Sequence, residues 1–219
     1  MINCSFRASV ELFQKSSFLP IPFSLENYKL LLVMTKYTTY YKNSVIVAIA
    51  TTLLTLAIIC PMSYILTRFR YWWAKALVQL MLTAYMFPVL LLAIPMFVMF
   101  AKLKMYDTLI SVIIAHCTIT VPVGVWLMCG FFKGIPYDLE EAAMVDGSTP
   151  FGAFIHVVLP LSRSGIIATG IFSFIFSWTD YVYALTLLSS DELKTLPVGL
   201  AAIFGAVDMR WGEVMAGST

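Results

Sequence analysis

The sequence has 219 residues, of which 60% are hydrophobic and only 12% are charged, with a formal net charge of +2. Water-soluble domains carry about 25% charged residues, so this composition excludes an ordinary soluble protein. The basic residues lie beside apolar runs rather than in one patch, which argues against a nucleic-acid-binding surface.

The first 43 residues contain no apolar run long enough to cross a membrane. Pro20 and Pro22 interrupt any helix in this segment, because proline lacks the backbone N–H that a helix interior needs. Ser24 stands before Glu26 and Asn27, a pattern typical of a helix start. We therefore expect a short surface helix here, before the first visible span.

Four segments have the length and composition of membrane-spanning helices, which need about 20 mostly apolar residues. They are Ser44–Leu66, Ala76–Phe100, Leu109–Gly130 and Ile166–Leu188. The first three contain no Asp, Glu, Lys or Arg, and the fourth contains only Asp180. The pattern predicts an all-α fold, a polytopic transmembrane helical bundle forming one membrane domain over residues 44–219.

Prolines within the predicted spans indicate kinks. Pro88 and Pro95 lie in the second span, and Pro122 and Gly124 lie in the third. Each proline removes a backbone hydrogen bond, which a membrane tolerates only where neighbouring helices satisfy the freed carbonyl. Such kinks suit a moving gate, and they also occur as plain packing features, so both interpretations stay open.

The cysteines and histidines do not form a metal-binding pattern. Cys60, Cys117 and Cys129 lie within spans without a CxxC pair, so we expect small buried apolar residues. His116 lies alone in a span and His156 alone in a loop, and we expect each to have a packing or local hydrogen-bonding role.

The polar segment Tyr137–Pro160 separates two apolar runs, so it must lie in water at one face of the membrane. Asp138, Glu140 and Glu141 place negative charge at a helix N-terminus, where the helix dipole favours it. Gly147 is typical of a left-handed helix stop. Ser148 or Thr149 before Pro150 is typical of a new helix start.

The second helix of this loop carries apolar side chains at helical spacing. Phe151, Phe154, Ile155 and Val158 fall at i, i+3, i+4 and i+7, which predicts one apolar stripe. A pair of short helices outside the bilayer with such a stripe is suited to docking on another protein.

Asp180 is the one carboxylate inside a predicted span. A charged group costs about 2.5–3.5 kcal/mol at the centre of a membrane helix, so it should face a partner or a wet cavity. With Trp178 and Tyr181 beside it, Asp180 would suit polyol binding, since the carboxylate accepts hydroxyl hydrogen bonds and aromatic rings stack on sugar carbons. The alternative is a bond to a neighbouring helix.

The loop motif resembles a known family. Glu141-Ala142-Ala143, then Gly147, then Val157-x-Leu159-Pro160 closely matches the cytoplasmic EAA-x3-G-x9-I-x-L-P loop of ABC importer permeases, with Val157 in place of the usual Ile. The segments FSLENY (residues 23–28), NS (residues 43–44) and WTDY (residues 178–181) are similar to the maltose-type sugar permeases. The resemblance covers roughly residues 20–216.

The resemblance implies the membrane-spanning subunit of an ATP-driven importer of a sugar or oligosaccharide in the bacterial inner membrane. Its implied partners are a second permease, two cytoplasmic ATPase subunits that bind ATP, and an extracytoplasmic solute-binding protein. Residues 1–43 would then be extracytoplasmic, and residues 131–165 would form the cytoplasmic loop that couples to the ATPases. The coupling residues would be Glu140, Glu141, Ala142, Ala143, Asp146, Gly147, Phe151, Phe154, Leu159 and Pro160.

The family has six spans, so we expect this sequence to lack the first and the last. The chain itself has no GxxxxGK[ST] phosphate-binding loop, no nucleophile–base pair and no metal constellation, so we expect no enzymatic activity and no cofactor in this subunit. We also expect Leu196–Val207, which is too short to span, to form a surface or re-entrant helix.

The distribution of positive charge conflicts with the orientation that the motif implies. Five Lys or Arg residues lie on the side of the Tyr137–Pro160 loop and nine lie on the other side, whereas cytoplasmic loops usually carry the excess. We give the motif precedence because it is more specific. Alternatives are a permease for another small solute such as a polyol phosphate, a secondary transporter, or a membrane protein without transport. A secondary transporter predicts ionisable residues in several spans.

Overall fold

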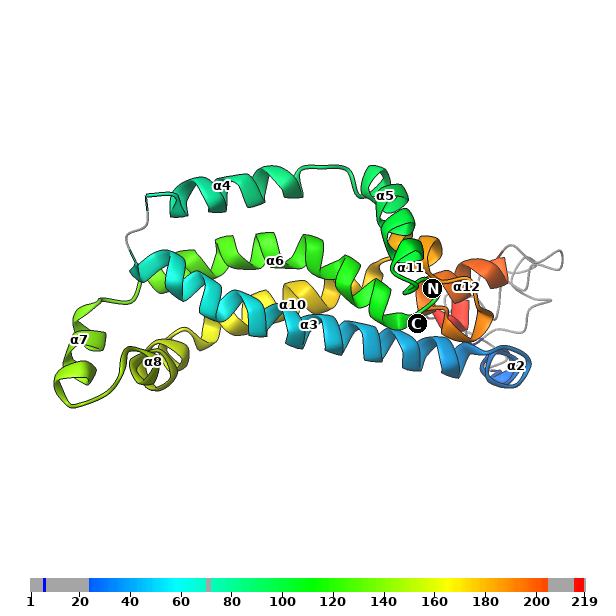
Figure 1. Ribbon diagram of the computed structural model, residues 1–219. Coiled ribbons are helices and arrows are strands. Elements are labelled where there is room, and N and C mark those ends of the chain that lie inside the picture. Colours follow the sequence, from blue (N-terminus) through cyan, green and yellow to red (C-terminus); the bar gives the residue numbers. More distant parts are fainter. Residues whose placement is uncertain (1–5, 7–23, 70–71, 205–214, 219) are drawn as a thin grey trace.

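The computed structural model of the chain describes Phe6 and residues 24–69, 72–204 and 215–218. Within these ranges every regular element is a helix, which confirms the predicted all-α class. Figure 1 shows an elongated bundle, with α7 and α8 at one end and α2 and α12 at the other.

Three helices form the body of the bundle. Helices α3 (Tyr37–Arg68), α6 (Leu109–Lys133) and α10 (Arg163–Thr179) pack against one another along their lengths. Helices α3 and α6, which contain the first and third predicted spans, are each long and apolar enough to cross a membrane alone. At 32 residues, α3 extends beyond the predicted Ser44–Leu66 at both ends.

The second predicted span is not one kinked helix. It consists of α4 (Ala74–Tyr85) and α5 (Val89–Lys102), which meet at an angle of 98°. The break falls at Pro88, which lacks an N–H and restricts the backbone of Phe87 before it. Helix α4 packs on α6, whereas α5 packs on α11 (Val182–Leu187). Together the two helices still have the length and composition of a broken span.

The fourth predicted span is also broken. Helix α10 ends at Thr179, and Asp180 has an extended backbone before α11 begins. The Asp180 carboxylate accepts hydrogen bonds from the backbone N–H groups of Tyr183 at 3.4 Å and Ala184 at 3.0 Å. These N–H groups have no partner inside the first turn of α11, so the side chain that breaks the span also caps the next helix. The prediction of one continuous helix over Ile166–Leu188 was therefore wrong.

The buried side chains form two clusters, one toward each end of the bundle. The first includes Val47, Phe100 and Tyr183, and lies where α3, α5, α6 and α11 meet. The second includes Ile59, Met128 and Phe132, and it extends into the segment after α8 (Pro150–Ala153). Each end of the bundle is therefore held by its own core.

At the end opposite α7, side chains at the start of α3 hold the segment after α11. The Asn43 amide donates to the carbonyls of Glu192 and Lys194 at 2.8 and 3.0 Å, and the hydroxyl of Ser44 accepts from the Leu196 N–H at 2.8 Å. This segment contains the short helix η2 (Asp191–Leu193) and leads into α12 (Leu196–Phe204). The end of the predicted helix Leu196–Val207 lies outside the described residues.

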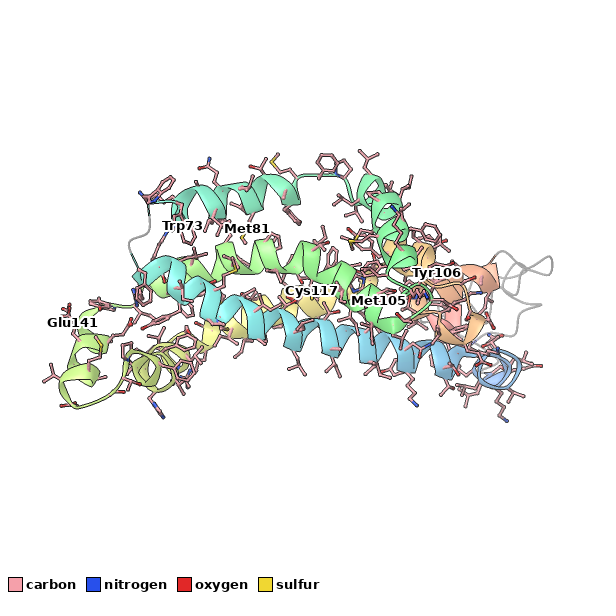
Figure 2. The ribbon with its side chains drawn as sticks, in the orientation of Figure 1. Trp73, Met81, Met105, Tyr106, Cys117 and Glu141 are labelled. Carbon is pink, nitrogen blue, oxygen red and sulfur yellow. The ribbon has the colours of Figure 1, made fainter. Side chains whose placement is uncertain are left out.

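The same end contains the turn between α5 and α6, where Figure 2 labels Met105 and Tyr106. Asp107 in this turn accepts hydrogen bonds from the N–H groups of Ser189 and Ser190 at 2.8 and 2.9 Å. These bonds, with one from the Ser190 hydroxyl, lower the pKa of the Asp107 carboxyl. The predicted short helix after Ser24 is α2 (Glu26–Met34), which lies beside α3 at this end.

Candidate functional site: the 137–160 loop and its anchor

The loop folds as two short helices with a sharp break, as its sequence predicts. Helix α7 spans Asp138–Val145, and Gly147 follows two residues later with a φ of +93°, in the left-handed region. The Ser148 N–H donates to the Ala143 carbonyl at 2.9 Å, and the Gly147 N–H donates to the Met144 carbonyl at 3.1 Å. This pair of bonds is the usual way in which a glycine terminates a helix.

The next helix starts with a cap and a proline. The Thr149 hydroxyl accepts from the Gly152 N–H at 3.0 Å, and Pro150 occupies the first position of α8. The chain continues as a π-helix, η1 (Phe154–Val158), and a short α9 (Leu159–Leu161). Pro160 has no N–H to offer to the carbonyl of His156, which gives a physical reason for the irregular turn.

Glu140 fastens α7 to the end of α3. Its side chain is 1% exposed and forms an ion pair with Arg68, whose side chain is 10% exposed. The Tyr64 hydroxyl, also on α3, donates to the other carboxylate oxygen at 2.9 Å. Arg68 in turn donates from Nη2 to the Ile135 carbonyl at 3.1 Å. Breaking a buried ion pair costs about 3–5 kcal/mol, so this pair holds α7 strongly to α3.

Aromatic packing adds a second connection between the loop and α3. Phe154 is buried, with its ring centroid 4.7 Å from that of Tyr64 and 6.4 Å from that of Phe132 in α6. Val158 is fully buried in the same cluster, and Leu159 packs against it. The segment after Pro150 is therefore held on the bundle by its apolar residues.

The predicted single apolar stripe divides between two faces. Phe154 and Val158 face the core, whereas Phe151 is 68% exposed and Ile155 is 39% exposed. A π-helical turn contains more residues than an α-helical turn, so residues at α-helical spacing no longer share one face. The prediction of one stripe was wrong, and two of its four members are free to contact a partner.

The outer face of the loop combines exposed apolar and acidic side chains. Leu139, Val145 and Phe151 are 45%, 87% and 68% exposed. Of these three, only Phe151 is a predicted coupling residue, and the rest of that predicted set has mixed exposure. Glu141, Ala142, Asp146, Gly147 and Pro160 are exposed, and Ala143 is partly buried. Figure 2 shows Glu141 on α7, at the end of the molecule.

A second polar site lies inside the bundle, at the break in the fourth predicted span. Nε2 of His116 in α6 is 3.2 Å from Oδ2 of Asp180, and the two side chains are 1% and 6% exposed. The other ring nitrogen of His116 is 2.8 Å from the Ser177 hydroxyl. Figure 2 labels Cys117, the residue next to His116, in the middle of α6. His116 therefore has the hydrogen-bonding role that the sequence predicts, with Asp180 and Ser177 as its partners.

The three residues predicted to line a sugar pathway have different surroundings. Asp180 contacts His116, which corresponds to the alternative of a bond to a neighbouring helix. Trp178 stacks on Phe174, with ring centroids 5.8 Å apart, and meets the ring of Tyr41 edge-on at 5.6 Å. Tyr181 is 41% exposed. Sugar binding by these residues stays a prediction.

Within the described residues, no group of three His, Cys, Asp or Glu side chains is placed to hold a metal ion. Cys60, Cys117 and Cys129 are free thiols.

Two threonines connect the central helices α3 and α6, with the hydroxyls of Thr55 and Thr120 2.7 Å apart.

Sequence reasoning missed Arg68, Tyr64 and His116 as parts of these sites. Their partners are distant in the sequence, so no local pattern identifies them. A signal was available for His116, because it is the one basic side chain within the four predicted spans and Asp180 is the one carboxylate. For Arg68, the signal was its position at the end of a span, on the side of an acidic loop.

Comparison with known proteins extends this picture to the whole chain. The family model described as "Binding-protein-dependent transport system inner membrane component" matches residues 53–205. The inner membrane ABC transporter permease protein YcjP of Escherichia coli K12 is 33% identical over 221 residues, covering 100% of this chain and 79% of that protein. The trehalose transport system permease protein SugB of Mycobacterium tuberculosis is 29% identical, covering 91% of this chain and 74% of that protein.

A solved structure shares the fold. It is a crystal structure of a bacterial ABC transporter involved in the import of the acidic polysaccharide alginate. Its matching chain gives a TM-score of 0.84 at 21% identity, covering 99% of this chain and 81% of that chain. With the family model covering most of the sequence, this chain belongs to the family of inner membrane components of binding-protein-dependent transport systems, which are ABC transport permeases.

Proposed function

We propose that this chain is the permease subunit of an ATP-driven importer for a sugar or oligosaccharide, in the inner membrane of a bacterium. Two relatives support the substrate class by their names. One is the trehalose permease protein SugB, and the other is a diacetylchitobiose uptake permease of Streptomyces coelicolor, 28% identical over 99% of this chain. The fold match to an alginate importer agrees with the same class.

The proposed partners are a second permease, two ATPase subunits and an extracytoplasmic solute-binding protein. The outer face of the 137–160 loop supports an ATPase contact, because Val145 and Phe151 expose apolar surface beside the carboxylates of Glu141 and Asp146. ATP would be bound by the partner ATPases, which would leave this chain to carry motion rather than chemistry.

The observation that carries the proposed coupling is the buried contact of Glu140 with Arg68 and Tyr64. A displacement of α7 by an ATPase would pull on α3 directly, because two side chains of α3 hold one side chain of α7. Helix α3 continues through Pro61 over its 32 residues, about 48 Å at 1.5 Å per residue. It could therefore pass a shift at the loop to the opposite end as one rigid element.

At that opposite end, α3 would meet the segment that it holds through Asn43 and Ser44. Alternating access would then be a shift between two packed states, driven by the tighter binding of ATP to one of them. We keep Trp178, Asp180 and Tyr181 as the proposed substrate pathway. Asp180 would become available to a sugar hydroxyl only after α6 and the α10–α11 break separate.

Reconstitution tests the proposal. The permease would be purified together with a second permease, an ATPase and a binding protein encoded by neighbouring genes. The purified proteins would then be incorporated into liposomes. We expect accumulation of a radiolabelled disaccharide, with trehalose and maltose as probes, that requires both ATP and the binding protein. Accumulation driven by a proton gradient without ATPase would contradict the proposal and favour a secondary transporter.

A further inference from the structure

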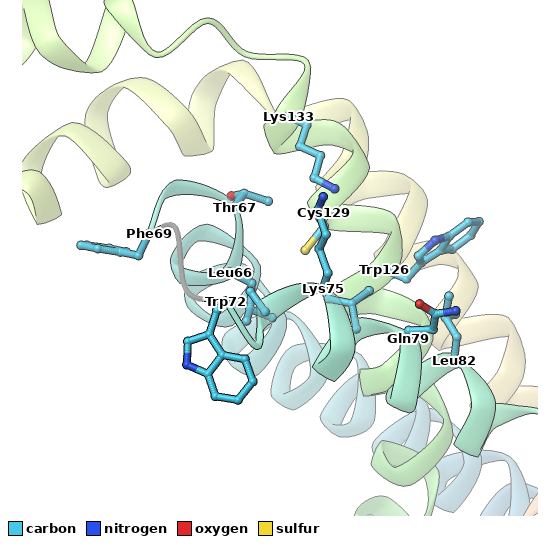
Figure 3. Close-up of a pocket in the computed structure, with 12 residues that line it drawn as sticks. Leu66, Thr67, Phe69, Trp72, Lys75, Gln79, Leu82, Trp126, Cys129 and Lys133 are labelled. Carbon is cyan, nitrogen blue, oxygen red and sulfur yellow. The ribbon is translucent and has the colours of Figure 1, made fainter.

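A crevice opens beside the loop end of the bundle, between the end of α3, the start of α4 and α6 (Figure 3). Its volume is about 750 Å³, within the range of about 300–1,000 Å³ that ligand sites occupy. Its lining is mixed, with two lysines and two tryptophans among apolar side chains. The lining residues that matter here are Leu66, Trp72, Lys75, Leu82, Trp126 and Lys133.

The two cations converge without a counter-charge. Lys75 extends from α4 and Lys133 from α6, and Figure 3 shows their side chains reaching toward each other. No carboxylate in the described part of the chain forms an ion pair with either, and the nearby carboxylate of Glu140 is taken by Arg68. Two ammonium groups facing one space repel each other, so the site favours an anion between them.

The rest of the crevice is apolar and aromatic. Leu66, Leu82 and the half-exposed Trp126 also line the crevice, and Trp72 is 92% exposed. Tryptophan beside lysine is the combination found where a membrane helix crosses from the acyl chains to the headgroups. A ligand that fits must therefore carry negative charge at one end and apolar chains at the other.

We propose that this crevice binds an anionic phospholipid, with its phosphate between Lys75 and Lys133 and an acyl chain along Leu82 and Trp126. A small inorganic anion would leave the apolar wall uncovered, and a zwitterionic lipid would bring no net charge to the two ammonium groups. Basic crevices between membrane helices are where acidic headgroups bind. The lipid would fill the space between α4 and the body of the bundle, which α4 contacts chiefly through α6.

Quenching of tryptophan fluorescence tests the site in the purified full chain. The probes are phosphatidylglycerol and phosphatidylcholine with the same dibrominated acyl chains, titrated into detergent micelles. We expect phosphatidylglycerol to quench at concentrations at least tenfold lower. Trp126→Phe should remove most of this selective quenching, and Trp178→Phe, which changes a tryptophan outside the crevice, should retain it. Equal quenching by both lipids would overturn the proposal. An absence of quenching at Trp126 would also overturn it, and would point to a crevice covered by protein.

Charge variants test the headgroup contact. A lysine near a membrane surface contributes about 1 kcal/mol to binding an acidic lipid, so each neutralised lysine should reduce the preference about fivefold. We expect Lys75→Gln with Lys133→Gln to abolish most of the preference, and Lys75→Arg with Lys133→Arg to keep it. The matched control is Lys42→Gln with Lys102→Gln, two exposed lysines outside the crevice. An equal loss in the control pair, or an unchanged preference in the first pair, would overturn the assignment.

Discussion

Arg68 at the end of α3 and Glu140 in the first turn of α7 form a buried ion pair, and the Glu140 side chain is only 1% exposed. The pair joins α3, the longest described helix of the bundle, to the 137–160 loop. The neighbouring Glu141 is exposed, so two adjacent carboxylates have separate roles. One holds the loop to its own chain, and the other is available to a partner.

The first prediction concerns this difference. Glu140→Gln removes the charge that compensates Arg68, so we expect a loss of stability of about 3 kcal/mol, as for other broken buried pairs. Glu141→Gln is the matched control and should change the melting temperature of the purified chain by much less, because exposed charges contribute little. Thermal unfolding in detergent measures both variants. Equal melting temperatures for the two would contradict the anchoring role of Glu140.

The second prediction concerns the break between α7 and α8. An added Cβ at Gly147 meets no atom within 4 Å, and the same is true of Gly130 in α6. Of these two glycines, only Gly147 has a positive φ. Gly147→Ala should therefore destabilise the protein by about 1 kcal/mol or more, whereas Gly130→Ala should be neutral or stabilising. Paired melting curves of the two variants decide the sign of each change.

In the reconstituted transporter, Gly147→Val should lower uptake while membrane insertion is retained. Near-normal uptake would count against a rigid loop.

The third prediction concerns His116 and Asp180. Asp180→Asn and His116→Gln should each lower thermal stability, and a double-mutant cycle should give a coupling of about 0.5–2 kcal/mol, since the two side chains are in contact. Apparent sugar affinity would be measured on the same samples. Additive effects on stability would show that the pair is not a bridge. A changed sugar selectivity at unchanged stability would favour the substrate pathway.

The fourth prediction concerns pH at the opposite end. Hydrogen bonds from Lys194 and Lys36 lower the pKa of Asp191 to about 2. In the unfolded chain an aspartate titrates near 3.9, so this carboxylate stabilises the fold above about pH 4. That stability is lost as the pH falls toward 2. Asp191→Asn should flatten this part of the dependence of stability on pH. The effect should be modest because the Asp191 side chain is 47% exposed. A melting-temperature series across this range in both proteins measures it.

The sequence predicts the local structure of the loop well. The order Gly147, Thr149, Pro150 specifies a left-handed stop, a cap and a helix start, and the structure has all three. Each depends on the conformational preference of one residue and its immediate neighbours. The first and third spans are likewise evident from composition, because an unbroken apolar run of that length has few other uses.

Features that depend on distant residues were not predictable in this way. The ion pair of Arg68 with Glu140 joins two segments that only the packing of α3 against α6 brings together. The contact of Asp180 with His116 is of the same kind, because His116 lies in another helix and supplies a partner for a carboxylate that would otherwise be costly inside the bundle. The divided apolar stripe arises from a change of helical turn at η1, which no periodicity rule includes.

We propose that the 137–160 loop drives the spans through Glu140 and Arg68. The most direct measurement is the number of sugar molecules imported per ATP hydrolysed by the reconstituted transporter. For Glu140→Gln and Arg68→Gln, in samples where the permease still assembles with the ATPase, we expect continued ATP hydrolysis with at least a tenfold lower transport ratio. Glu192→Gln, at the opposite end, should leave the ratio unchanged. Wild-type ratios in both anchor variants would show that the contact between Glu140 and Arg68 does not transmit the motion.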